Sequence, residues 1–513
     1  MSMCYHKNMM ASKAQSEVYS PFVTFAFVLI FVGMAWGKNV STLSDKMVFT
    51  VEKREVEMRA INRLRVSSDG RYFLDGEKPV ALFGSGLWTI IPDTTIDIED
   101  HNRWYARYGS NANRATLFAF CTRVGEGRGV CPWERTGPGT ANDGKPKFDL
   151  TKPNEAFWKR AHEYFESTRR HGIYVLLQIF DEPFIERSKD RWWLNPFNPE
   201  NNVNDLPRLP GGIGSGEEAF YDPDNAPLMA IQDALVKRLL DETALRYGHI
   251  IYEIGNEINM DSLTSKAERW QQHWIDFFRA YEKEHNVNLL LSNDTRRSLL
   301  QAAGEGFQVI NHHGALGVRI PLKQIGDMPI RLYDAITRDF ARWRRPILNS
   351  RPCSDPDRTD YPDIVTEEVG RAIYWSYFCS GGHVIGFRTT EESWKGGLAA
   401  ERILQHLHNF IRRTRFWEMA PRQDLVDGDN LCLAHPGNEY IVYLPHGGAV
   451  NVRLEQGDYS AVWYNPRTGE WSEPFHVEGG GRQALASRFI WEFTAPDERD
   501  WTLLIRAGRE LDD

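Results

Sequence analysis

The sequence predicts an α/β protein: a (β/α)8 (TIM) barrel followed by a small all-β sandwich. Eight short apolar runs alternate with amphipathic helical windows between residues 65 and 420, which is typical of repeated βαβ units. This span of about 350 residues exceeds the ~250 of a typical barrel, so the loops must contain insertions. From residue 421 the pattern changes to short alternating runs separated by turn residues, which indicates a sandwich.

The N-terminal segment predicts export. Residues 21–37 carry no charge, follow Lys7 and Lys13, and precede Lys38. Such a run is typical of a signal peptide or a signal anchor, and we expect cleavage near Lys38. We therefore divide the chain into a leader at 1–38, a linker at 39–64, a barrel at 65–420 and a sandwich at 421–513. The expected location is secreted or extracytoplasmic, with membrane anchoring through residues 21–37 as the alternative.

The barrel strands follow from apolar runs of four to eight residues. We expect them at 80–83, 112–118, 173–180, 250–254, 288–291, 308–311, 346–349 and 384–387. Two segments rich in Gly, Pro and Asn, 123–149 and 187–226, follow the second and third strands and are the expected insertions. Loops after strands lie on the catalytic face of such a barrel.

The sandwich strands are expected at 439–444, 449–454, 459–464, 489–493 and 501–505. These runs contain turn residues but no cluster of acid and base groups, so the sandwich is predicted to be accessory to the barrel. We expect Trp463 and Trp471 to pack against the barrel or inside the sandwich.

Composition excludes several functions. Lys and Arg total 61 against 70 Asp and Glu, a net charge of −9 without a basic stripe, so nucleic-acid binding is not expected. Beyond the leader the cysteines form no CxxC pair, and the sequence HEYFE at 162–166 lacks the second histidine of a zinc protease, so no metal or cofactor is expected. Cys121 and Cys131 bracket a glycine-rich loop and could form a disulfide in an oxidising compartment.

The fourth strand ends in Asn256-Glu257, which is the most informative dipeptide of the chain. The same dipeptide occurs at 154–155 and 438–439, but only the copy at 256–257 ends a predicted buried strand. Glycoside hydrolysis requires a carboxylic acid that protonates the leaving oxygen and a second carboxylate as nucleophile or base. Glu257 is the predicted acid/base, and Glu253 on the same strand needs a partner such as an arginine.

Several segments carry a family resemblance. GSNANRATLF at 109–118 and YEIGNE at 252–257 resemble clan A glycoside hydrolases. FDLTKPNEAFWKRAHEYFESTRRHGIYVLLQIFD at 148–181 and NPFNPENNVN at 195–204 resemble a group of secreted bacterial cellulase-like or apiosidase-like proteins. EYIVYLPHGG, AVWYNPRTGEW and DWTLLI are similar to a C-terminal sandwich described as collagen-binding. The resemblance implies Arg114 as a site-organising cation, Asn256 as a donor to a sugar hydroxyl, and Glu257 as the general acid/base.

The second carboxylate departs from this resemblance. The family implies an acid at or just after strand seven, yet the chain runs from Asn349 into Ser350, Arg351 and Pro352. The first acids there are Asp355 and Asp357, and we predict Asp355 as the catalytic partner. A turn in which these aspartates cap backbone amides is the alternative. Other acids that end strand candidates are Asp181, Glu182, Glu391 and Glu392.

Further candidates lie on the predicted rim. His312 and His313 close the sixth strand and could hold a sugar hydroxyl or fill a structural role. Trp192 and Trp193, in a polar insertion, are predicted sugar platforms; other tryptophans near the rim are Trp88, Trp133, Trp375 and Trp394. The sequence thus predicts a glycosidase of a polysaccharide or oligosaccharide, with a non-catalytic carbohydrate-binding pseudo-enzyme as the alternative.

Overall fold

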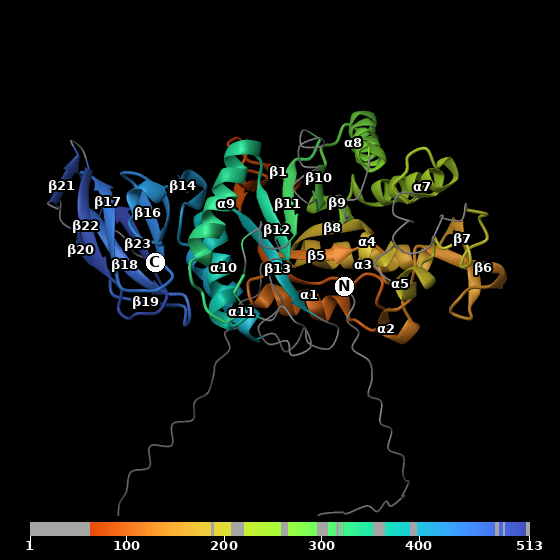
Figure 1. The fold of residues 1–513 in the computed structure, drawn as a ribbon, viewed down its shortest axis with the longest axis horizontal. Coiled ribbons are helices and arrows are strands. Elements are labelled where there is room, and N and C mark those ends of the chain that lie inside the picture. Colours follow the sequence, from red (N-terminus) through yellow and green to blue (C-terminus); the bar gives the residue numbers. More distant parts are fainter. Residues whose placement is uncertain are drawn as a thin grey trace, which may run out of the picture. The chain divides into compact units, whose positions relative to one another are not determined.

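The structure is a computed structural model, and the residues that it describes form a barrel followed by a sandwich (Figure 1). Described are residues 62–185, 189–206, 220–257, 265–294, 306–313, 318, 320–321, 323–351, 365–389, 398–477, 482–485 and 488–508. The leader, with its predicted signal or anchor at 21–37, lies outside them. None of the helices in these ranges has the length and apolar content that a membrane crossing requires.

Eight parallel strands form the barrel, as the sequence predicted. In chain order they are β4 (Phe83–Leu87), β5 (Ala112–Thr116), β8 (Tyr174–Asp181), β9 (Ile250–Asn256), β10 (Leu290–Asp294), β11 (Val309–His313), β12 (Ile347–Arg351) and β13 (His383–Thr389). The sheet order is β4-β13-β12-β11-β10-β9-β8-β5. Backbone hydrogen bonds from Asn111 to Phe83 (3.2 Å) and from Thr116 to Trp88 (2.8 Å) connect the two end strands and close the ring.

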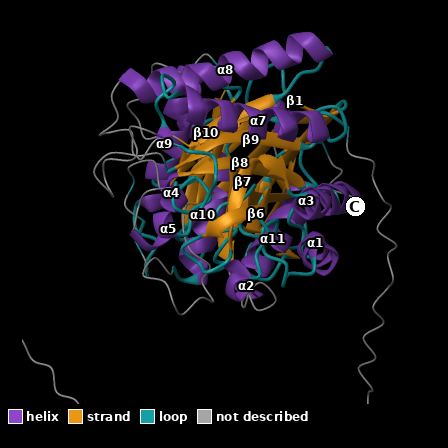
Figure 2. Cartoon of the chain, turned by 90° about the vertical axis from the view of Figure 1, so that its right-hand side faces the viewer, coloured by secondary structure: helices purple, strands orange, loops and turns teal. Residues whose placement is uncertain are grey.

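Helices surround these strands (Figure 2). Their buried residues recur at helical spacing, as in α3, where Phe157, Ala161, Tyr164 and Phe165 face the sheet. The larger helices are α1 (Ile98–Arg107), α3 (Glu155–Arg170), α7 (Ala226–Thr243), α8 (Ser265–His285), α9 (Met328–Trp343), α10 (Glu367–Cys379) and α11 (Leu398–Ile411). The shorter ones are α2 (Val124–Gly127), α4 (Glu182–Ile185) and α5 (Lys189–Trp193).

A small antiparallel sheet contributes to an apolar cluster at the amino ends of the barrel strands. It consists of β1 (Leu64–Val66), β2 (Phe73–Asp75) and β3 (Lys78–Val80). Leu64 and Phe73 belong to one buried cluster with Leu176, Ile251 and Leu348 of the barrel. Apolar side chains thus fill much of this end, and the active sites of such barrels lie at the opposite end, where the carboxyl ends of the strands meet.

The predicted first strand at 80–83 is wrong. Val80 ends β3 and Phe83 begins β4, so the apolar run spans two different elements. The true strand is Phe83–Leu87, with glycines at 84 and 86 that hydropathy does not detect. A Cβ on Gly84 would lie 1.8 Å from the Ala112 carbonyl oxygen, and one on Gly86 would lie 2.3 Å from Asn113 Oδ1. The close approach of β5 therefore requires glycine at both positions.

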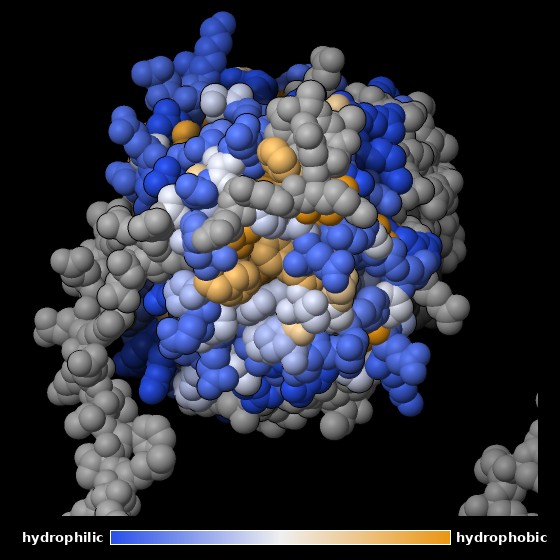
Figure 3. Space-filling model, turned by 90° about the vertical axis from the view of Figure 1, so that its left-hand side faces the viewer, coloured by the Kyte–Doolittle hydropathy of each residue, from blue (hydrophilic) through white to orange (hydrophobic). Residues whose placement is uncertain are grey.

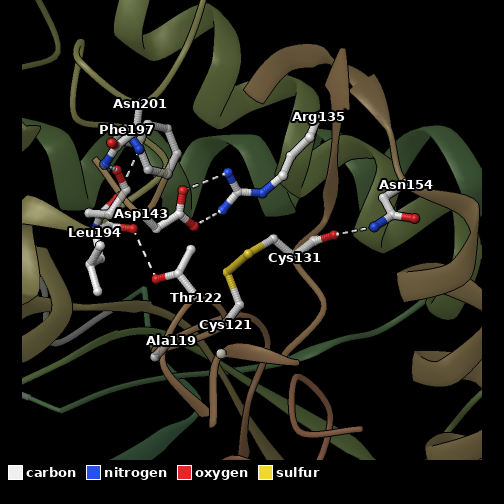
Figure 4. The surroundings of a disulfide bond; sticks show 12 residues. Ala119, Cys121, Thr122, Cys131, Arg135, Asp143, Asn154, Leu194, Phe197 and Asn201 are labelled. Atoms are coloured by element: carbon white, nitrogen blue, oxygen red, sulfur yellow. Dashed lines mark hydrogen bonds and ion pairs between the residues drawn. A yellow bond between two sulfur atoms is a disulfide. The ribbon is translucent and has the colours of Figure 1, made fainter. Parts of the chain in front are cut away.

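The first insertion folds into a hairpin, β6 (Trp133–Thr140) with β7 (Pro146–Pro153), next to a disulfide (Figure 4). Cys121 and Cys131 are bonded, which resolves the open question of their pairing. Thr122 Oγ1 donates to the Leu194 carbonyl oxygen at 2.9 Å and so links this loop to the second insertion. The two insertions thus support each other.

The sandwich has more strands than the five that the sequence predicted. The long ones are β15 (Leu431–His435), β16 (Glu439–Leu444), β17 (Ala449–Glu455), β18 (Tyr459–Asn465), β22 (Arg488–Thr494) and β23 (Trp501–Ala507). Short additions are β14 (Ala420–Pro421), β19 (Glu470–Trp471), β20 (Phe475–Val477) and β21 (Arg482–Leu485).

On the face seen in Figure 3, a hydrophobic area is surrounded by hydrophilic side chains.

Aromatic side chains join the sandwich to the barrel. Helices α9, α10 and α11 lie between the barrel strands and the sandwich (Figure 1). Trp375 of α10 stacks on Tyr443, with ring centroids 5.6 Å apart, and Trp471 stacks on Phe410 of α11 at 5.3 Å. Trp463 is buried in the sandwich core. The predicted packing of Trp463 and Trp471 is confirmed.

Candidate active site

Glu257 directly follows β9, the fourth barrel strand, as predicted. Its φ of +51° lies in the left-handed region, which non-glycine residues seldom occupy. Its backbone N–H donates to Asp294 Oδ2 at 3.3 Å, at the end of the neighbouring strand β10. Such conformations persist where the surrounding structure holds them, and they cluster at functional sites.

Arg351, the last residue of β12, meets the Glu257 side chain. Its Nη1 lies 3.0 Å from Glu257 Oε1, and the two side chains are 20% and 13% exposed. The Arg351 backbone N–H donates to Asn349 Oδ1 at 2.9 Å, which fixes the strand end. Strand seven therefore presents a cation to Glu257 at the place where the resemblance implied a carboxylate.

A buried network surrounds Asn256, the last residue of β9. Arg114 donates to Asn256 Oδ1, and Asn256 Nδ2 donates to Asp181 Oδ1 at 2.6 Å. Asp181 also accepts from Gln178 Nε2 at 3.0 Å and from the Phe184 backbone N–H at 3.1 Å. Burial raises the pKa of Asp181 to about 6, and the Glu257 charge adds to this rise while the Asn256 hydrogen bond opposes it.

Glu253 lies deeper in the barrel and is fully buried. Arg114 Nη2 is 3.6 Å from its carboxylate, so the expected arginine partner is confirmed. Asn311 of β11 also donates to Glu253, and the Asn311 amide nitrogen lies 3.0 Å from Ser350 Oγ. Arg114 thus contacts both Glu253 and Asn256, and its role as a site-organising cation stays a prediction.

His312 is not brought into this site. Its Nε2 lies 3.3 Å from Asp339 Oδ2 on α9, outside the barrel. Because side chains alternate along a strand, the inward position belongs to Asn311. The structural alternative for His312 is therefore the one that the geometry supports.

The predicted aromatic platforms divide into exposed and buried residues. Trp193 is 55% exposed, and Trp192 is half-buried against the barrel core. Trp133 and Trp375 are buried in the core and cannot form sugar platforms. The position of a tryptophan in the sequence near a predicted rim loop does not show whether its ring points into the core or towards solvent.

Several predicted acids lie outside the described residues. Asp355 and Asp357 fall there, as do Glu391, Glu392 and Trp394. The assignment of Asp355 as the second carboxylate stays a prediction. Across the described ranges, no group of three or more His, Cys, Asp or Glu is placed to hold a metal ion.

Asp294 and Asn311 were not among the predicted site residues, and the contact between Arg351 and Glu257 was not predicted. Each ends, or lies near the end of, an apolar run that forms a barrel strand. Since the carboxyl ends of parallel strands meet at one edge, polar residues at these positions are candidates for the site. That rule, applied to all eight strands, would have found them.

Comparisons with known proteins agree with this architecture. Residues 130–303 match the model of a domain of unknown function, DUF6298, and residues 421–506 match the "Putative collagen-binding domain of a collagenase". No curated protein matches the chain. A solved structure described as a glycoside hydrolase is similar with a TM-score of 0.56 and 16% identity, covering 87% of this chain and 97% of its own.

A family 5 glycoside hydrolase from Bacteroides vulgatus ATCC 8482 is similar with a TM-score of 0.57 and 14% identity. The match covers 87% of this chain and 93% of that protein. At identities this low, the structural similarity shows a shared fold and nothing more specific. The chain thus combines the (β/α)8 barrel fold of these glycoside hydrolases with a C-terminal β-sandwich.

Proposed function

We propose that the chain is a glycoside hydrolase of a polysaccharide or oligosaccharide, with Glu257 as the general acid/base. One observation carries the proposal: Asn256-Glu257 ends the fourth strand of a barrel shared with glycoside hydrolases, and Arg114 and Asp181 hold Asn256 there. Glu257 gives a proton to the glycosidic oxygen as the bond from C1 to that oxygen breaks. A second carboxylate attacks C1 or activates the water that replaces the leaving group.

Asp355 is the proposed second carboxylate, from the loop that follows strand seven. Strands four and seven lie across a barrel mouth from each other, so an acid there can face Glu257. The required separation of the carboxyls is about 5–5.5 Å for retention and about 6.5–9.5 Å for inversion. Asp294 is the next candidate, because its carboxylate contacts the Glu257 backbone itself.

The test is a hydrolysis screen of polysaccharides and oligosaccharides with the full chain and its variants. Glu257→Gln is nearly isosteric, and we expect it to lower kcat on poor leaving groups by about 10²–10⁴-fold, because it removes the proton donor. Asp355→Asn and Asp294→Asn rank the candidates for the second carboxylate. Glu155→Gln is the matched control, since it changes the same Asn-Glu dipeptide at an exposed helix start.

The second candidate function is a carbohydrate-binding pseudo-enzyme on the same barrel. Arg351 favours it, because the residue that ends strand seven beside Glu257 is a cation and not an acid. Saccharide binding without hydrolysis by the wild-type chain would support this alternative. Hydrolysis that Glu257→Gln leaves at full rate would contradict the proposed role of Glu257.

We also propose that the protein is exported, as a secreted chain or tethered through residues 21–37. The Cys121–Cys131 disulfide supports export, because disulfides persist in oxidising compartments. N-terminal sequencing of the exported protein distinguishes the two forms. A start near Lys38 means cleavage, and retention of residues before Pro21 means an anchor.

A further inference from the structure

The contact between Arg351 and Glu257 conflicts with a resting general acid. A guanidinium at 3.0 Å stabilises the ionised form of the carboxyl group. A general acid, however, must carry a proton when the glycosidic bond breaks. Arg351 must therefore move away from Glu257, or be neutralised by another anion, before Glu257 can act.

We propose that Arg351 binds an anionic substituent of the sugar, and that this exchange lets Glu257 take up its catalytic proton. The substituent is a carboxylate, as in a uronic acid, or a sulfate ester, since both accept the planar donor pair of a guanidinium. This inference rests on the proposed glycosidase function and names its substrate class. Polysaccharides that carry such groups are the expected substrates.

The proton balance is simple. In the free chain Arg351 is paired with the Glu257 carboxylate. The incoming anion replaces that carboxylate at the guanidinium, and Glu257 takes one proton from solvent, so the charge of the site is unchanged. The same proton then passes to the glycosidic oxygen in the bond-breaking step.

The neighbouring charges support this exchange at Arg351 rather than at another residue. Arg114 is committed to Glu253 and Asn256 and is nearly buried. Arg351 is more exposed than Arg114, and its Nη1 lies 3.0 Å from Glu257 Oε1. The described charged groups around Glu257 are Arg351 on β12, Asp294 on β10, Asp181 on β8, Arg114 on β5 and Glu253 on β9.

The test is isothermal titration of the full chain with three sets of oligosaccharides. Oligogalacturonides and alginate fragments carry carboxylates, carrageenan fragments carry sulfates, and cello- and manno-oligosaccharides are neutral. Titration in two buffers of different ionisation enthalpy measures the protons taken up per bound ligand. We expect an anionic set to bind at least tenfold more tightly than the neutral set, with uptake of close to one proton near pH 7.

Two variants test the roles of Arg351 and Glu257 separately. Arg351→Gln should weaken anionic binding at least tenfold and abolish the proton uptake. Glu257→Gln should bind the anionic ligand at least as tightly as the wild type, without proton uptake, because its amide does not titrate and attracts Arg351 less strongly than the carboxylate does. Arg338→Gln, an exposed arginine on the outer helix α9, is the control and should change neither quantity.

Several results would overturn the inference. These are equal or tighter binding of the neutral set, an unchanged preference in Arg351→Gln, proton uptake that persists in Glu257→Gln, and binding of no set. Arg351→Lys covers the case in which the glutamine variant does not fold; it should keep part of the anionic preference. Anionic binding with proton uptake but no hydrolysis would instead refute the glycosidase proposal alone.

Discussion

Two arginine–carboxylate pairs occupy different regions of this molecule. At the barrel mouth, Arg351 Nη1 lies 3.0 Å from Glu257 Oε1, and both side chains are partly exposed. Between the barrel and the sandwich, Arg371 holds Asp500 through two hydrogen bonds of 2.6 and 2.8 Å, with side chains only 6% and 1% exposed.

The surroundings of the two pairs explain the difference. Asp500 also accepts from Tyr443, and Arg467 lies 3.7 Å from it, so the interface pair is enclosed by further partners. A bidentate, enclosed pair fixes geometry and has no room to exchange partners. The side chains of the mouth pair are more exposed to solvent than those of the interface pair, which is the condition that the proposed exchange of partners needs. The comparison teaches that an arginine–carboxylate pair enclosed by further partners fixes the packing of two regions, whereas a partly exposed pair stays accessible at the proposed site.

The largest effect should come from the interface. Asp500→Asn is nearly isosteric but leaves Arg371 buried without its counter-charge, so we expect a loss of about 3–5 kcal/mol in the free energy of unfolding. Chemical denaturation measures this loss, and kcat per folded molecule should not change. Asp424→Asn, in the more exposed pair with Arg422, is the control and should cost less than about 1 kcal/mol. An equal loss of unfolding free energy in both variants would show that the enclosed pair stabilises the fold no more than the exposed pair does.

Asp181 is a buried carboxyl group at the barrel mouth, and its titration should make the stability of the fold depend on pH. Burial raises its pKa to about 6 from an ordinary value of 3.8, so between these values the folded chain binds the proton more tightly than the unfolded chain. Its contribution to stability is therefore complete below pH 3.8 and is lost as the pH rises through 6.

Asp181→Asn should remove this titration. The stability of the wild type relative to the variant should fall by at most about 3 kcal/mol between pH 4 and pH 7. Denaturation at a series of pH values measures it, and the groups common to both chains cancel. A difference that stays flat, or that grows with pH, would contradict the stated direction.

The Cys121–Cys131 disulfide should contribute to the free energy of unfolding. Cys121 and Cys131 are ten residues apart, and closing such a loop contributes about 2–3 kcal/mol in the chain-entropy account. The double variant Cys121→Ser, Cys131→Ser should lose that amount in thermal or chemical unfolding. A reductant should lower the stability of the wild type towards the variant and leave the variant unchanged. A variant as stable as the oxidised wild type would refute this contribution.

The smallest effect is expected at the exposed Trp193. If its ring forms a sugar platform, Trp193→Ala should raise KM about two- to tenfold through lost stacking, with kcat and stability unchanged. Trp417→Ala is the matched control, because Trp417 is 41% exposed but lies in a short helical turn just before the sandwich. Equal KM values for both variants would show that Trp193 has no role in binding.

Much of the fold could be predicted from the sequence because its cause is local. Buried parallel strands need continuous apolar runs, and seven of the eight barrel strands were found from such runs. The first strand escaped because Gly84 and Gly86 are required by the approach of β5, a contact between segments that hydropathy cannot detect. Glu257 was found because Asn256-Glu257 directly ends an apolar run.

The remaining parts of the site depend on residues far apart in the chain. Arg351 and Glu257 are 94 residues apart, and their contact arises only when strands four and seven enter one barrel. The inward position of Asn311 and the outward position of His312 depend on the register of β11 in that barrel.

The sequence by itself therefore determined the order of strands and helices, the change to a sandwich near residue 421 and the position of Glu257 at a strand end. Local hydropathy and turn chemistry are sufficient for these features. Only the tertiary structure decided which charges meet, because ion pairs at strand ends depend on how eight strands close. Closure placed a cation against Glu257 and enclosed the Arg371 and Asp500 pair between the barrel and the sandwich.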